Sequence, residues 1–391
     1  MQRGGRPPPV LGVSTLTVLE PRPRRKRWPF ILAATLLGAL AMAAGSTRFL
    51  ATFGGRLEGP RLERVRRSPQ FDGQRFVNPV PTNLLTPGTF WEMIRHQLFG
   101  EEERVPRSPL PVVSRSTADY ATPPASGLRA TWIGHASTLV EIDGHRILTD
   151  PVWSERVSPS RWVGPRRFHP PPLPIEALPP IDVVLVSHDH FDHLDMATVQ
   201  ALAARGSRFA VPLGVGAHLE TWSIPPEQIS ELDWGESVRV GDLELIATPA
   251  RHYSGRNPFR RDGTLWSSWV VKGPRHRIFF SGDSGYFDGF RAIGAAHGPF
   301  DLTLVKIGAS DRAWQDVHMS PEEAVRAHVD LGGKLLLPVH WGTFNLGLHA
   351  WNAPAEEAVA AAIARSVTIA VPRPGQWVEP SDPSPLDTWW R

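Results

Sequence analysis

The stretch LVSHDHFDHLD, residues 185–195, contains three histidines and three aspartates within eight positions. It continues the apolar run IDVVLV (181–186), which predicts a buried strand. Burying so many ionisable groups is costly, and a bound cation would compensate that cost. The stretch therefore predicts a metal site that begins where the strand ends.

The spacing of these residues predicts room for two ions. His188 and His190 are two residues apart, so on a strand their imidazoles point the same way and reach one ion. Asp192 and His193 follow in the turn before a helix, and they are better placed to hold a second ion. The chain has no cysteine, and a set of His and Asp ligands suits zinc while tolerating iron or manganese.

Further ligand candidates end other apolar runs. His252 follows LELIATPAR, Asp283 follows RIFFSG, and His340 follows KLLLPV, in the same arrangement as His188. We expect these strand ends to meet at one edge of the fold. A carboxylate such as Asp283 can bridge two cations.

Strand patterns and helix patterns alternate from residue 129 onward, which favours an α/β fold of sheets covered by helices. A helix is expected after Asp195, and this carboxylate could orient a ligand or cap the helix; we expect the cap. A second helix is expected after Ser320, with Glu323 completing a capping box. The predicted strands are 129–135, 137–143, 146–150, 181–188, 208–214, 243–250, 265–273, 277–283, 302–308 and 335–342.

The pattern H-x-H-x-D-H, followed by a distant His, an Asp in a GD pair and a last His, resembles the metallo-β-lactamase superfamily. Longer stretches resemble the family of N-acylphosphatidylethanolamine-hydrolysing phospholipases D and its bacterial relatives. The resemblance runs from about residue 71 to about residue 380. It is carried by TWIGHASTLVEIDGHRILTDPVWSERVSP, GPRRF, LPPIDVVLVSHDHFDHLD, FSGDSGY, HMSPEEAV and HWGTF.

This resemblance implies a four-layer αββα sandwich with two zinc ions per chain at one edge of the sheets. It assigns one ion to His188, His190 and His252, and the other to Asp192, His193 and His340, with Asp283 as the bridge. It also places His135, Asp150 and His318 near the site. Asp150 would support the ligands from behind, as ligating histidines generally require.

The resemblance also implies an activity, that of a zinc-dependent phosphodiesterase of the phospholipase D type. Attack of a metal-bound hydroxide on phosphorus would release phosphatidic acid and an N-acylethanolamine. We expect direct catalytic roles for Asp192, Asp283 and, as a candidate general acid, His318. The alternatives are hydrolysis of a lactone, a β-lactam or a soluble phosphodiester at the same site. A non-catalytic, membrane-tethered zinc protein is a further alternative.

The basic charge of the chain is concentrated at its start. Residues 1–67 hold 13 Lys and Arg against three acidic residues, whereas the remainder holds 29 basic and 36 acidic residues. An acidic body argues against nucleic acid as a partner, because nucleic-acid binders carry basic surface on the folded domain. The abundance of Trp over Tyr, 15 against three, favours a phospholipid substrate and a membrane surface.

The same end of the chain resembles a targeting segment. A basic region (1–27) precedes an apolar run (28–47) that reads as a signal peptide or membrane anchor. Residues 48–125 are expected to form a linker and an extension with one helix over 90–100, and residues 126–391 the hydrolase domain. The body would then lie on the outer side of the cytoplasmic membrane, either anchored there or secreted to the periplasm.

Overall fold

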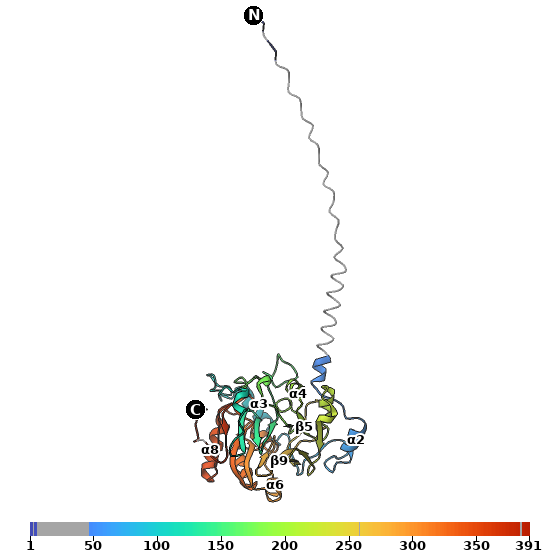
Figure 1. Ribbon diagram of the computed structural model, residues 1–391, viewed down its shortest axis with the longest axis vertical. Coiled ribbons are helices and arrows are strands. Elements are labelled where there is room, and N and C mark those ends of the chain that lie inside the picture. Colours follow the sequence, from blue (N-terminus) through green and yellow to red (C-terminus); the bar gives the residue numbers. More distant parts are fainter. Residues whose placement is uncertain (3, 6–46, 258, 384) are drawn as a thin grey trace. The chain divides into compact units, whose positions relative to one another are not determined.

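The computed structural model describes residues 1–391 except 3, 6–46, 258 and 384. The chain forms two units, Met1–Arg48 and Phe49–Arg391, and every element named below belongs to the second (Figure 1). Within the described ranges, no helix is both long and apolar enough to cross a bilayer. The predicted signal or anchor over residues 28–47 falls outside those ranges except at its last residue.

The first sheet has seven strands in the order β13-β1-β2-β3-β4-β5-β6. Its first members form an antiparallel meander, and β3, β4, β5 and β6 run parallel to one another. The strands are β1 (Leu128–Gly134), β2 (Ser137–Ile142), β3 (His145–Thr149), β4 (Val183–Leu185), β5 (Arg208–Pro212), β6 (Ile229–Leu232) and β13 (Trp377–Val378).

The second sheet has six strands in the order β12-β11-β10-β9-β8-β7. Strands β10, β11 and β12 are parallel, and β8 shares their direction because both β8 and β10 are antiparallel to β9. The strands are β7 (Ser237–Val240), β8 (Leu243–Thr248), β9 (Ser268–Lys272), β10 (Arg277–Phe280), β11 (Phe300–Lys306) and β12 (Gly333–Val339).

Helices cover the outer face of each sheet and complete the predicted αββα sandwich. Strand β4 shows why: Val183 and Leu185 face the core shared with the second sheet, whereas Val184 faces the core under α4 and α5. The helices are α2 (Gly59–Arg66), α3 (Phe90–Phe99), α4 (Met196–Ala203), α5 (Gly216–Thr221), α6 (Gly289–His297), α7 (Pro321–Asp330) and α8 (Ala353–Ala364). Helices α6, α7 and α8 pack against the second sheet.

The two capped helices begin where the sequence predicted. Asp195 is the N-cap of α4, and its carboxylate accepts a hydrogen bond from the backbone N–H of Ala197. Ser320 and Glu323 form the capping box of α7. The extension is less linker-like than expected, because it contains α2 as well as the predicted α3.

Candidate metal centre

The predicted ligands come together at the ends of strands in both sheets. The loop after β4 supplies four of them, and the loops after β8, β10 and β12 supply one each. The described residues form four overlapping groups, in each of which the ligand atoms lie within 4.8 Å of one another, and two of these groups contain six of the seven predicted ligands. The first is His188, His190 and His252, and the second is His135, Asp192, His193 and His340.

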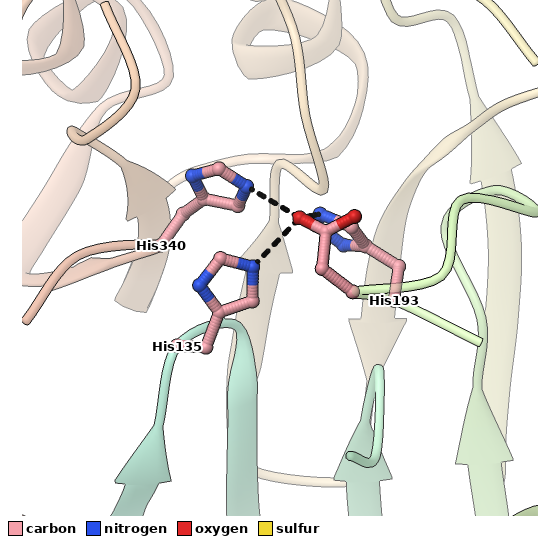
Figure 2. Close-up of side chains that lie close together, drawn as sticks. His135, His193 and His340 are labelled. Carbon is pink, nitrogen blue, oxygen red and sulfur yellow. Dashed lines mark hydrogen bonds and ion pairs between the residues drawn. The ribbon is translucent and has the colours of Figure 1, made fainter. Parts of the chain in front are cut away.

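One oxygen of Asp192 is the focus of the second group. Figure 2 shows the imidazoles of His135, His193 and His340 pointing at a single carboxylate oxygen. Asp192 Oδ2 lies 3.0 Å from His135 Nε2 and 3.3 Å from both His193 Nε2 and His340 Nε2.

Asp283 lies between the two groups. Its Oδ2 atom is 3.4 Å from His193 Nε2 and 3.1 Å from His340 Nε2. The same oxygen is 3.9 Å from His252 Nε2, which belongs to the first group. In that group, His190 Nδ1 lies 2.9 Å from His188 Nε2 and 3.4 Å from His252 Nε2. Asp283 therefore lies within 4 Å of histidines from both groups.

Several nitrogen and oxygen atoms of the residues in this centre have no hydrogen-bond partner among the described residues. They are His193 Nε2, Asp283 Oδ1, His318 Nδ1 and both ring nitrogens of His340. These side chains are almost fully buried, where an unpaired polar atom is costly. Imidazole nitrogens and carboxylate oxygens at a shared point are the donor set that a transition metal prefers, so the residues fit a metal.

Burial and neighbouring charges move the pKa values of the cluster in different directions. Burial lowers the pKa of His252 to about 3, and it lowers that of His188 well below the usual range. Burial acts the same way on His193, but the carboxylates of Asp283, Asp192 and Asp150 outweigh it and raise that pKa well above its usual value. Burial thus favours the neutral form of His188 and His252, which is the form that binds a metal.

A layer of contacts orients the ligand rings from behind. Asp150 Oδ2 accepts a hydrogen bond from His193 Nδ1 at 2.6 Å, and Asp150 Oδ1 accepts from the backbone N–H of Ser187 at 2.7 Å. His252 Nδ1 donates to the carbonyl of Val317 at 3.0 Å, which leaves Nε2 free to face the centre. Asp150 therefore lies behind the ring of His193, where a ligating histidine generally has a hydrogen-bond acceptor.

Three residues of the site have positive φ, in or near the left-handed region. The φ angles are +53° at His135, +32° at Asp150 and +64° at His340. Residues other than glycine rarely adopt this conformation, and surrounding contacts must hold them there. The carbonyl of His135 accepts from the backbone N–H of His340, which joins the β1–β2 turn to the end of β12.

The remaining predicted residues also reach the centre. His135 contacts Asp192 directly, and burial together with the neighbouring His340 lowers the pKa of His135 to about 3. His318 Nδ1 lies 3.7 Å from Asp283 Oδ2, and burial lowers the pKa of His318 well below its usual range.

Sequence reasoning missed two polar residues at the site. Ser187 Oγ lies 2.9 Å from His188 Nδ1, and its position directly before the first ligand was the available signal. Lys306 ends β11 fully buried, and its ammonium donates to the carbonyl of Met319 at 3.1 Å. Burial lowers the pKa of Lys306 to about 7. A lysine ending an apolar strand pattern was the corresponding signal.

A pocket opens beside the second ligand group. Its walls include His135 and His340 from the centre and the guanidinium-bearing side chain of Arg104 from the extension. The remaining wall residues are mainly aromatic or aliphatic; among them are Trp341, Phe344, Leu346 and Trp351. The metal centre therefore adjoins a space with both apolar and polar walls.

Comparison with known proteins places the chain among metal-dependent hydrolases. Residues 145–341 match the family described as the beta-lactamase superfamily domain. An uncharacterized protein of Mycobacterium tuberculosis is 49% identical over 335 residues, covering 83% of this chain and 88% of its own. An N-acyl-phosphatidylethanolamine-hydrolyzing phospholipase D of Caenorhabditis elegans is 37% identical over 264 residues, covering 64% of this chain and 74% of its own.

A solved structure supports the fold alone. Igni18, a metallo hydrolase of the archaeon Ignicoccus hospitalis, superposes with a TM-score of 0.51 at 23% identity. The match covers 64% of this chain and 97% of that chain.

Proposed function

We propose that this chain, which belongs to the metallo-β-lactamase superfamily and within it to the family of the N-acylphosphatidylethanolamine-hydrolysing phospholipases D, is a zinc-dependent phosphodiesterase of that type. Its substrate would be an N-acylphosphatidylethanolamine-like lipid. The observation that carries the proposal is the convergence of buried, unpartnered imidazole and carboxylate atoms around Asp283.

The proposed ligand assignment follows the two groups. His188, His190 and His252 would hold one zinc ion, and Asp192, His193 and His340 the other. Asp283 would bridge them, in keeping with its short distances to His193 and His340 and its longer distance to His252. His135 would stay a hydrogen-bond partner of Asp192.

A metal pair supplies a water of lowered pKa and withdraws charge from a bound phosphate. Other residues of the chain would keep the ligand rings in the required orientation. Asp150 would fix the ring of His193 through the bond to Nδ1, and the carbonyl of Val317 would do the same for His252. His318 would face the leaving alcohol, since it lies beside Asp283 and borders an adjacent pocket. Burial lowers its pKa well below the usual range, so the ring would be neutral and would not serve as the general acid.

A lipid substrate gains support from helix α3. Phe90, Trp91, Leu98 and Phe99 of this helix are exposed, with Trp91 at 76%. Arg104, which lines the pocket beside the metal centre, donates to the carbonyl of His96 in α3 at 2.7 Å. Apolar and aromatic side chains beside a pocket mouth would suit contact with a bilayer.

The tryptophan count itself supports a lipid surface less than the sequence suggested. Trp132, Trp266, Trp269 and Trp390 are fully buried, and Trp132 stacks on Trp341 in the core. Among tryptophans that the structure describes, only Trp91 and Trp162 are strongly exposed. The support therefore comes from α3 and not from composition.

The decisive experiment is a product analysis with the full chain. The protein is loaded with zinc and incubated with N-acylphosphatidylethanolamine in mixed micelles, with and without chelator, and products are identified by mass spectrometry. Release of phosphatidic acid and N-acylethanolamine that chelator abolishes is the expected result. The absence of release from protein with confirmed metal content would reject the lipid substrate and turn the search to lactones, β-lactams and soluble phosphodiesters.

A further inference from the structure

The segment just before α2, residues 51–55, packs against the loop that carries most of the ligands. The carbonyl of Ala51 accepts from Trp222 Nε1 at 2.7 Å, and the ring of Phe53 meets the ring of Phe191 edge to face at 6.3 Å. Phe191 lies between the ligands His190 and Asp192 in the sequence. The segment therefore reaches the metal loop although it is more than 130 residues away in the chain.

One arginine joins this segment to both ends of the ligand loop. Arg256 Nε donates to the carbonyl of Thr52 at 2.7 Å, and Nη1 donates to the carbonyls of Asp189 at 2.9 Å and Leu194 at 2.8 Å. Asp189 and Leu194 flank the ligands at 190, 192 and 193. Arg256 is 2% exposed, and its guanidinium also lies 4.2 Å from the ring centre of Phe191.

A histidine makes a second connection to the same loop. The backbone N–H of Gly55 donates to His218 Nδ1 at 2.9 Å, so the other ring nitrogen carries the proton and faces Asp189 Oδ2 at 3.4 Å. That carboxylate also accepts from the N–H of Gly255 at 2.9 Å and from Thr264 Oγ1 at 3.1 Å. Asp189 lies between His188 and His190 in the chain, so the contacts that fix its side chain also limit where the two ligands can lie.

The approach of the segment to His218 is very close. A Cβ placed on Gly54 would lie 2.0 Å from His218 Nδ1, and Gly54 has a φ of +82°. A Cβ on Gly55 would lie 2.1 Å from the carbonyl of Ala217. The glycine pair is therefore a requirement of this contact.

We infer that residues 51–55, Arg256 and His218 form a brace that positions the ligand loop for metal binding. The inference rests on the proposed metal site. Its consequence is that residues 51–55, at the start of the second unit, help to build the centre. Removing the brace would weaken metal binding even though it contributes no ligand. Arg256 and His218 are positioning residues in this arrangement.

The test measures zinc affinity of the full chain by competition with a chromophoric chelator. Arg256→Lys keeps the charge but loses the planar fork that reaches three carbonyls, and it is expected to weaken zinc binding at least about tenfold. Arg129→Lys is the matched control, because Arg129 is also buried and paired, with Glu141, but contacts no ligand loop. It should lower the melting temperature and leave zinc affinity unchanged.

A second test compares the same substitution at two glycines, Gly54 and Gly59. Gly54→Ala introduces the clash with His218, whereas Gly59→Ala, at a φ of +54° with nothing within 4 Å of its Cβ, carries the backbone strain alone. Weaker zinc binding in Gly54→Ala but not in Gly59→Ala supports the brace. Wild-type zinc affinity in Arg256→Lys or in Gly54→Ala overturns it. If the wild-type chain itself binds no metal, the proposed function fails first, and the two failures are thus distinguishable.

Discussion

The ligand cluster and helix α3 depart from the usual distribution of side chains in opposite directions. The cluster buries imidazoles and carboxylates, which are normally exposed, and α3 exposes Trp91, Leu98 and Phe99, which are normally buried. Each departure costs free energy unless a partner compensates it. A cation would compensate the first, and an apolar surface the second. The two regions thus point to two different partners, and we predict that each can be disturbed without the other.

The largest effect is expected from removing the bridging carboxylate. Asp283→Asn keeps the shape of the side chain but loses the charge that faces His193 and His340, and activity should fall at least about 100-fold with loss of bound metal. Asp301→Asn is the control, because Asp301 makes only exposed contacts, with Lys334 and the N–H of Arg277. Full activity and full metal content in Asp283→Asn would show that the other ligands bind the metal without this carboxylate.

A smaller effect is expected from Asp150, which hydrogen-bonds the ligand His193 and is not itself a proposed ligand. Asp150→Asn replaces the acceptor of the His193 Nδ1 proton with a side chain that can turn its amide toward it. The expected result is roughly 10- to 100-fold weaker metal binding, measured by chelator competition, with all ligands still present. Unchanged affinity would mean that burial and the carboxylates of Asp192 and Asp283 orient His193 without Asp150.

The pH dependence of the melting temperature tests whether ion pairs of His193 stabilise the ligand cluster when no metal is bound. The pKa of His193 is raised by Asp283, Asp192 and Asp150 against the effect of burial. Stability from these ion pairs is therefore fully present below the ordinary imidazole pKa and is lost as pH rises through the raised value. With chelator, the melting temperature should fall as pH increases above neutral. With zinc, the loss should disappear, because binding favours the deprotonated ring. A flat profile in chelator would contradict the raised pKa.

The sequence predicted the buried ligand cluster far better than the exposed apolar side chains of α3. His188, His252, Asp283 and His340 each end an apolar run, so strand periodicity was enough to place them at one edge. Arg256 and His218 act through backbone carbonyls and a neighbouring carboxylate, and no local pattern identifies such partners in advance.

The exposure of the apolar side chains of α3 is visible only in the structure, because hydrophobic periodicity does not show what covers a helix. The pattern FWEMIRHQLF predicted α3 correctly, but it did not show whether the apolar residues of the helix would be covered. None of its residues is fully buried. Similarly, only three-dimensional packing could show that twelve of the fourteen described tryptophans are buried or half-buried.

The smallest effect is expected at α3 and separates the two regions. Trp91→Ser removes the most exposed apolar side chain of the helix, and binding to phosphatidylethanolamine vesicles should weaken several-fold in a sedimentation assay. Ile363→Ser on α8, an equally apolar residue at 71% exposure, is the matched control and should bind vesicles as the wild type does. Zinc affinity should be the same in both variants. Equal loss of vesicle binding in both would mean that general surface hydrophobicity, and not α3, attracts the lipid, whereas loss of zinc from Trp91→Ser would show that the two regions are coupled.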